Sequence, residues 1–203
     1  MMQAQYFYPQ RPKLCARSLM GRFEREPRRW LAELKLNGDR CVVVVTKARE
    51  LQLWNRHGEP LKYRPPKWMK DQLLDALPAN TVLDGELMHA RVRELKNCLA
   101  LFDVIMYNGR LLITEPQRKR WSVLDSFIFP SWFAPPRDGG VVFILRRMPV
   151  RVAWERALLF PATWVEGIVV KDKTAPASVG LHRNPTAEGW FKIRRPKQGM
   201  YVM

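Results

Sequence analysis

The chain is poor in the residues that build metal sites and disulfide frameworks. Its cysteines are odd in number and far apart, without a C-x-x-C pair: Cys15, Cys41 and Cys98. This pattern excludes the usual zinc-binding spacings and favours buried, reduced thiols. The histidines show no ligand spacing either, so we expect surface or packing roles for His57, His89 and His182.

Long apolar segments are also lacking. No run approaches the roughly 20 residues that a membrane-spanning helix needs. The first residues, Met1 to Gln5, lack the apolar core of a signal peptide. We therefore expect a cytoplasmic protein that has no membrane partner.

Acidic residues are scarce relative to basic ones. The 203 residues include 35 Lys and Arg against 19 Asp and Glu, a net charge of +16. Such an excess attracts polyanions by counterion release and electrostatic steering. An anionic membrane surface is the alternative, but no sustained basic amphipathic helix is present. The composition thus favours a nucleic-acid partner and, with it, a cytoplasmic or nucleoid-associated location. The length suits one domain, without internal repeats.

One stretch, Ala32 to Arg40, combines a lysine, a tight turn and an arginine. Gly38 lets the backbone turn beside Lys35, and Arg40 can return to the same pocket to clamp a phosphate. The apolar run from Cys41 to Val45 predicts a strand that holds the turn. At a strand end, partly desolvated and beside another cation, Lys35 would expose a nucleophilic amine. An ordinary surface lysine in a loop is the alternative.

Further polar residues lie at the ends of predicted strands. Glu86 follows Asp84 and Gly85, and Glu166 begins the run that ends at Lys171. Glu86 could bind a ribose hydroxyl or a divalent metal, and with Glu166 could hold Mg²⁺. Strand alternation places Lys192 and Arg194 on one face, as a phosphate clamp, and Phe191 and Ile193 on the other.

Periodicity predicts several further elements. We expect strands at 40–47, 51–54, 97–107 (a central strand) and 141–145, helices at 24–30, 67–77, 114–127 and 152–160, and a loop at 130–140. In the helix at 67–77, Trp68 is expected to be a core residue. In the helix that Thr114 would cap, Arg118, Lys119 and Arg120 are expected on an exposed turn.

Five segments together resemble a known family. The stretch Glu33-Leu34-Lys35-Leu36-Asn37-Gly38-Asp39-Arg40 is similar to the E-x-K-x-D-G-x-R signature of ATP-dependent polynucleotide ligases. The family's other nucleotidyltransferase motifs resemble, in the same order, Leu83–Leu87, Leu101–Ile105, Glu166–Lys171 and Trp190–Arg194. The resemblance spans the chain from about Arg11 to Arg195.

The resemblance implies a fold and a set of roles. The fold class would be α+β, with two antiparallel sheets and flanking helices enclosing a nucleotide cleft, an ATP-grasp-like ligase adenylation domain. A single nucleotidyltransferase domain would cover residues 1–203. The implied catalytic residue is Lys35, and the implied ATP-binding residues are Glu33 (adenine amino edge), Arg40, Arg56 (ribose or 5′-phosphate), Glu86, Phe102 (stacked on adenine), Lys171, Lys192 and Arg194. ATP and Mg²⁺, held by Glu86 and Glu166, would be the cofactors.

The implied reaction is nick sealing through a lysyl–AMP intermediate, on nicked duplex DNA, in DNA repair or replication. A compact viral or bacterial-accessory type of ligase fits best. Two departures from the family pattern matter. Asn37 stands where the family usually has aspartate, which RNA ligases also tolerate. Only nine residues follow Arg194, too few for the family's C-terminal OB-fold domain, so we expect slow self-adenylylation unless a separate OB-fold or other accessory chain helps.

Three alternatives remain open. An RNA ligase is the nearest. A GTP-using capping enzyme fits less well with Glu33. A catalytically weak nucleic-acid-binding module that keeps the fold, and needs a partner domain, belongs to a different class; it would bind nucleic acid without a covalent nucleotide.

Overall fold

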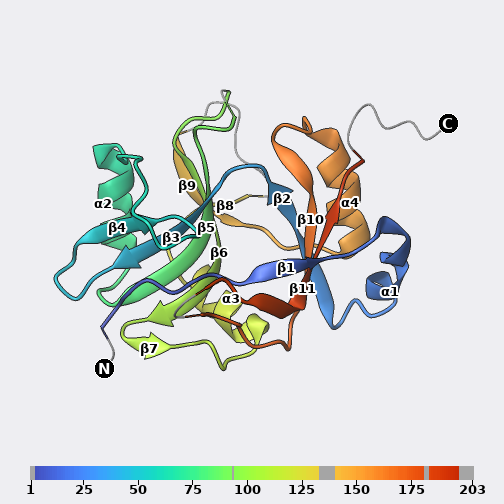
Figure 1. Cartoon of the computed structure of the whole chain (residues 1–203), viewed down its shortest axis with the longest axis horizontal. Coiled ribbons are helices and arrows are strands. Elements are labelled where there is room, and N and C mark those ends of the chain that lie inside the picture. Colours follow the sequence, from blue (N-terminus) through green and yellow to red (C-terminus); the bar gives the residue numbers. More distant parts are fainter. Residues whose placement is uncertain (1–2, 93, 133–139, 181–182, 197–203) are drawn as a thin grey trace.

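Two sheets lie side by side and make up most of the molecule (Figure 1). The computed structural model describes residues 3–92, 94–132, 140–180 and 183–196. The four-stranded sheet has the order β1 (Arg11–Leu14), β11 (Thr186–Arg194), β10 (Val165–Asp172) and β2 (Trp30–Leu36). The seven-stranded sheet has the order β4 (Leu51–Trp54), β3 (Asp39–Val45), β5 (Thr81–Met88), β6 (Cys98–Tyr107), β9 (Val141–Leu145) and β8 (Ser131–Trp132), with β7 (Arg110–Leu111) paired to β6.

Helices cover the outer faces of both sheets. α4 (Val150–Leu159) packs on β2 and β10, and α1 (Gly21–Glu24), after the short 3-10 helix η1 (Arg17–Leu19), contacts α4. α2 (Lys67–Ala76) and α3 (Gln117–Asp125) pack on the seven-stranded sheet. The expected α+β class with two sheets and flanking helices is confirmed. The sheets are mainly antiparallel, but the pairs β1–β11, β6–β9 and β8–β9 are parallel.

Because side chains alternate along a strand, β2 presents one face to a hydrophobic core and the other to the space between the two sheets. Ala32, Leu34 and Leu36 are buried in the core that α4 also enters. Glu33 and Lys35 point to the opposite face, toward the space between the sheets. Strand β6 is buried along nearly its whole length, as the prediction of a central strand required.

Most predicted elements appear with small shifts of their ends. Strands 51–54 and 141–145 are confirmed as β4 and β9, and helix 67–77 as α2, ending one residue earlier. Helix 152–160 starts earlier, at Val150. Helix α3 begins after Pro116, which takes the N-cap position expected for Thr114.

Three predictions about local structure are wrong. The helix expected at 24–30 ends at Glu24, and Trp30 instead starts β2, because residues 30–36 pair with β10. Trp68 is 40% exposed on α2, whereas Met69 and Leu73 fill the core below it. Arg120 is fully buried in an ion pair rather than exposed.

Other expectations concern the cysteines, the histidines and the loop. The three cysteines are buried free thiols, as expected. His182 and positions 133–139 of the expected loop lie outside the described residues. Within the part of the chain described, none of the helices combines the length and apolar character needed to span a bilayer.

Candidate active site

A cavity of about 410 Å³ opens between the two sheets, a size typical of small-molecule sites. Its walls come from β2, β3, β5, β6, β10, β11 and β1 with the residues just before it, which contribute Pro9, Arg11 and Pro12. Every site residue expected from the sequence lines this one cavity: Glu33, Lys35, Arg40, Arg56, Glu86, Phe102, Glu166, Lys171, Lys192 and Arg194. Six segments that are distant in sequence therefore meet at a single site.

Lys35 and Glu166 face each other across two paired strands. The Lys35 Nζ lies 2.7 Å from a Glu166 carboxylate oxygen, and both side chains are mostly buried. Glu166 reaches this position through a β-bulge: Val165 pairs with Leu36 and Gly167 pairs with Lys35, so Glu166 is the extra residue on β10. A bulge re-aims a side chain, and here it turns Glu166 toward the lysine.

Gly167 makes this bulge possible. Its φ is +147°, and a Cβ at this position would lie 2.1 Å from the carbonyl oxygen of Ile193 on β11. Only glycine accepts both the backbone conformation and the close approach.

Cations surround the Lys35–Glu166 pair. Arg194 lies 3.5 Å from Glu166 and remains about half exposed. Burial lowers the pKa of Lys192, and the nearby charges of Arg194, Lys35 and Arg11 lower it further. Such a concentration of positive charge around one carboxylate suits an anionic ligand with several charges. Arg11 was not among the expected site residues, because only the parallel pairing of β1 with β11 brings it here.

The turn between β2 and β3 joins the two sheets at the cavity. Asn37 Nδ2 donates to the carbonyl of Thr163 (3.0 Å), and the Gly38 N–H donates to Glu86 Oε1 (3.2 Å). A Cβ on Gly38 would lie 2.6 Å from the carbonyl oxygen of Leu87. An aspartate in place of Asn37 could not donate to Thr163, which gives the departure from the family signature a local structural reason.

Glu86 stands across the cavity from Glu166 on β5. Burial raises the pKa of Glu86 to about 7; Asp84 and Glu166 act in the same direction, against Arg40 and Lys35. Two facing carboxylates suit Mg²⁺, which takes few protein ligands and keeps water or phosphate oxygens for the rest. Among the described residues no cluster of three or more His, Cys, Asp or Glu side chains could hold a metal.

The opposite end of the cavity is aromatic and charged. Between Asp84 and Gly85 the register of β5 against β6 shifts, which leaves Phe102 as the extra residue on β6 and a lining residue of the cavity. The Arg40 guanidinium lies 4.9 Å from the centre of the Phe102 ring. It also pairs with the buried Asp84 carboxylate through two donors. Arg40 is thus held by Asp84, a partner that the sequence analysis did not assign to it.

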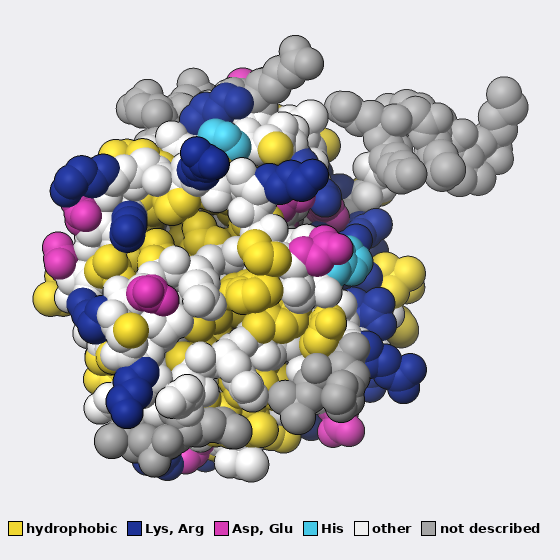
Figure 2. All heavy atoms as spheres, turned by 60° about the vertical axis from the view of Figure 1, so that its left-hand side comes forward, with side chains coloured by type: hydrophobic (Ala, Val, Ile, Leu, Met, Phe, Trp, Pro, Cys, Tyr) yellow, Lys and Arg dark blue, Asp and Glu magenta, His cyan; other side chains and the backbone are white. Residues whose placement is uncertain are grey.

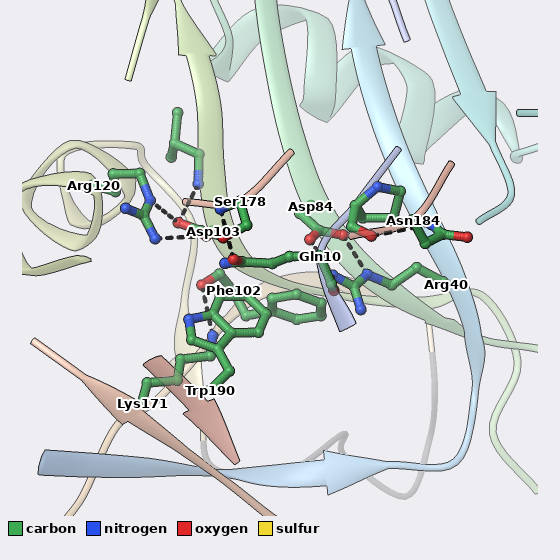
Figure 3. A network of polar contacts seen from close by, with 12 residues as sticks. Gln10, Arg40, Asp84, Phe102, Asp103, Arg120, Lys171, Ser178, Asn184 and Trp190 are labelled. Carbon is green, nitrogen blue, oxygen red and sulfur yellow. Dashed lines mark hydrogen bonds and ion pairs between the residues drawn. The ribbon is translucent and has the colours of Figure 1, made fainter. Parts of the chain in front are cut away.

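Glu33 and Lys171 form a buried ion pair next to Phe102 (Figure 3 shows Lys171, Phe102 and Trp190). Their charged atoms lie 2.6 Å apart, with 1% and 3% of the side chains exposed for Lys171 and Glu33. Burial raises the pKa of Glu33 and lowers that of Lys171, and each partner opposes the shift of the other. Lys171 Nζ also donates to the carbonyl of Phe102 (3.2 Å).

One oxygen of this pair is left without a partner. Glu33 Oε1 is buried, and no described residue hydrogen-bonds to it. A buried carboxylate oxygen at the wall of a cavity is suited to accept from an N–H or O–H of a ligand.

Trp190 closes the same end and was missed as a site residue. Lys171 Nζ lies 4.0 Å from the centre of its ring. Its Nε1 donates to Gln117 Oε1 (2.8 Å), which also accepts from the buried Arg120. Arg120 in turn pairs with Asp103 (2.9 Å), the neighbour of Phe102 (Figure 3). This chain of contacts ties α3 to the wall of the cavity.

Arg56 differs from the other expected site residues. It lies in the exposed turn after β4, at the rim of the cavity, and its Nε donates to His57 Nε2 (3.0 Å). It is positioned to meet a charged group that enters from solvent.

Known structures share this fold. No family model and no curated protein matches the chain. A mycobacterial DNA ligase D complexed with ATP superimposes with a TM-score of 0.59 at 17% identity, covering 83% of this chain and 55% of that one. The ATP-dependent DNA ligase of bacteriophage T7, in complex with ATP, gives 0.57 at 12% identity, with 92% and 68% covered. An archaeal ATP-dependent RNA ligase gives 0.54 at 15% identity, with 91% and 48% covered.

The fold is therefore that of the nucleotidyltransferase domain of ATP-dependent ligases. The chain spans about half the length of the mycobacterial and archaeal enzymes. The expected resemblance is confirmed at the level of the fold.

Proposed function

We propose that the chain is the nucleotidyltransferase domain of an ATP-dependent DNA ligase, which seals nicks between a 5′-phosphate and a 3′-hydroxyl. The observation that carries the proposal is the position of the Lys35 amine. It lies in a nucleotide-sized cavity, 2.7 Å from Glu166, with cations around it and the unpartnered Glu33 oxygen at the aromatic end.

In the first step, Lys35 Nζ forms a bond to the α-phosphorus of ATP, and pyrophosphate leaves. Glu166 holds the amine and is the carboxylate nearest to take its proton. Lys192, Arg194 and Arg11 stabilise the phosphate charge, since phosphoryl transfer depends mainly on alignment and neutralisation. Glu86 and Glu166 would hold Mg²⁺, which supplies further neutralisation of the phosphates.

The base of ATP would lie at the other end. Phe102 and Trp190 offer aromatic surface there, and Glu33 Oε1 would accept from the adenine amino group. Lys171 holds Glu33 in place through their ion pair. In this arrangement Lys171 acts on the base side and does not contact the phosphates directly.

Two later steps complete the reaction. The AMP passes from Lys35 to the 5′-phosphate of the nick, near the rim residue Arg56, and the 3′-hydroxyl then displaces AMP. The high positive charge of the chain supports a polyanionic substrate. ATP and DNA as substrates would fit a cytoplasmic or nucleoid-associated enzyme of repair or replication.

Covalent labelling tests this proposal directly. With Mg²⁺ and α-labelled ATP, wild type should gain one AMP, Lys35→Ala should gain none, and Lys47→Ala, which alters an exposed lysine away from the cavity, should be labelled normally. Nucleic-acid binding without any label in wild type would instead support the non-catalytic module.

An RNA ligase is the second candidate, because an archaeal RNA ligase shares the fold and Asn37 replaces the usual aspartate. Competition between nicked DNA and nicked RNA duplexes for sealing by the same enzyme preparation would separate the two. Preferential sealing of RNA would overturn the DNA assignment but keep the ligase assignment.

A further inference from the structure

A second groove lies beside the candidate active site and is not used by any step above. Its volume is about 650 Å³, and it is formed by the segment after β4, the end of β5 and Asn97. Asp39 and Leu61 line both hollows, so the two are neighbours that share a wall. The shared wall is fixed by an ion pair, since Arg91 of the first hollow lies 2.8 Å from Asp39.

Two aromatic rings form the centre of the groove. The Tyr63 and His89 rings lie 4.7 Å apart, and both side chains are partly exposed. Tyr63 packs one side against the core of the seven-stranded sheet. The rings are inclined at 58° to each other, so a planar ligand can stack on the exposed face of one of them.

Hydrogen bonds hold these rings in one orientation. The Asn97 backbone N–H donates to His89 Nδ1 (3.4 Å), which leaves the Nε2 of His89 as its donor. Tyr63 OH donates to Asn97 Oδ1 (2.9 Å), so the Asn97 amide keeps its N–H donors for other partners. Asn97 has a φ of +55°, the left-handed conformation that asparagine adopts more readily than other non-glycine residues.

The charge at the rim indicates the chemistry of the occupant. Lys62 and Arg64 are exposed on the segment that carries Tyr63. On the face shown in Figure 2, Lys and Arg side chains lie around an apolar region, together with several Asp and Glu side chains. Cations beside an aromatic slot match a nucleic-acid strand, whose phosphates and bases alternate.

We propose that this groove binds a nucleotide of the nucleic-acid substrate, next to the end that reacts in the first cavity, by stacking on the Tyr63–His89 pair. This inference rests on the proposed function, because it takes the occupant to be the strand being joined. At a nick the terminal nucleotide has lost one covalent link of its strand, so it can swing out with less distortion of the backbone, at the cost of unstacking its base.

The test measures how changes in the groove alter the binding of intact and abasic substrates. The probe is a nicked DNA duplex, intact or with one of the two nucleotides at the nick replaced by an abasic residue. Wild type should bind one of the two abasic duplexes about tenfold more weakly than the intact duplex, as expected for the loss of one stacked base. Tyr63→Leu/His89→Leu should bind the intact and the abasic duplexes equally. Trp68→Leu, which removes an exposed aromatic residue outside the groove, should behave as wild type.

A second pair of variants avoids any effect on the core. Lys62→Ser/Arg64→Ser should weaken binding about tenfold more at 50 mM salt than Lys47→Ser/Lys70→Ser. The two double variants lose the same charge, and all four side chains are exposed. Equal losses of affinity in the two double variants would overturn the proposal. So would a wild type that binds the intact and both abasic duplexes equally, or a Tyr63→Leu/His89→Leu variant that still discriminates between them as wild type does.

The labelling of Lys35 by ATP needs no nucleic acid and reports the proposed function separately. The groove variants should be labelled like wild type. If wild type is labelled but changing Tyr63 and His89 does not alter the discrimination against abasic duplexes, the groove proposal alone is rejected. If that discrimination is lost as expected but wild type is not labelled, the ligase activity is rejected and a nucleotide-binding groove is kept.

Discussion

The buried pair of Glu33 and Lys171 gives the two oxygens of one carboxylate different surroundings. One oxygen meets Lys171, and the other meets no described residue. Removing one partner of a buried pair leaves an uncompensated charge, whereas replacing both by apolar groups often restores stability. We expect Lys171→Met to lower the free energy of unfolding by about 3 kcal/mol. Urea denaturation measures it.

The double variant Glu33→Leu/Lys171→Met is the control for this prediction. It should recover to within about 1 kcal/mol of wild type, because no lone charge remains in the core. Additive losses in the double variant would show that the residues stabilise the fold independently.

Glu86 gives the stability of the protein a pH dependence. Its pKa rises from an ordinary value of 4.5 to about 7, chiefly through burial. Between these values the folded chain keeps a proton that the unfolded chain releases, so the free energy of unfolding falls as pH rises. Glu86→Gln removes this effect. The free energy of unfolding of Glu86→Gln, relative to that of wild type, should therefore rise by about 2 kcal/mol as the pH increases from 5 to 8.

The measurement is urea denaturation of wild type and variant across that pH range. Glu94→Gln, which changes an exposed carboxylate, serves as the matched control and should follow wild type throughout. A constant difference between Glu86→Gln and wild type from pH 5 to 8 would contradict the raised pKa.

At the level of the strands, two bulges decide which side chains reach the cavity. The extra residue is Glu166 on β10 and Phe102 on β6. Simple alternation along either strand would not bring both residues to their places in the wall. The bulge at Glu166 also explains why a glycine must follow it.

Gly167→Ala should therefore damage both stability and activity. Its Cβ would overlap the Ile193 carbonyl, and the backbone would have to keep a φ of +147°. We expect a loss of more than about 2 kcal/mol in the free energy of unfolding. Labelling of Lys35 by ATP should also slow, because Glu166 would shift. Gly21→Ala meets only the tip of Arg25, at 3.8 Å, and should change stability by less than about 1 kcal/mol. Similar losses in both variants would argue against a special role for the bulge.

The strands were more predictable from the sequence than their pairing. Apolar runs such as 141–145 and 98–107 identify strands because burial on both faces leaves a continuous apolar pattern. The bulges and the parallel pair β1–β11 depend on contacts between distant segments, which no local pattern records. The burial of Arg120 was not predicted for the same reason, because its partner Asp103 lies 17 positions away on another element.

The residues lining the cavity were predictable for a different reason. Their motifs are short and keep a fixed order, so resemblance to the ligases indicated Lys35, Glu86, Glu166 and the cations without any geometry. The partners that hold them, such as Asp84 for Arg40, come from tertiary packing and required the structure.

At the scale of the whole molecule, the cavity is the place where the two sheets meet, and the short turn at Asn37 and Gly38 connects them. A ligand that binds only the folded chain stabilises it by an amount that grows with the logarithm of the ligand concentration above its Kd. For Lys35→Ala, which cannot form the covalent bond, ATP with Mg²⁺ at 100 times its Kd should add about 2.7 kcal/mol. For a chain of this size that corresponds to a rise in Tm of about 5–10 °C.

The choice of base should follow from Glu33. Its free oxygen can accept from the amino group of adenine but would repel the carbonyl oxygen that guanine presents at the same position. GTP should therefore raise the Tm of Lys35→Ala by much less than ATP does. In the double variant Lys35→Ala/Glu33→Gln, the new side chain supplies an N–H donor, so the difference between the Tm shifts with ATP and with GTP should shrink. Each shift is measured against the ligand-free Tm of the same variant. Equal shifts with ATP and GTP before Glu33 is changed would remove the adenine-reading role and return a GTP-using enzyme to consideration.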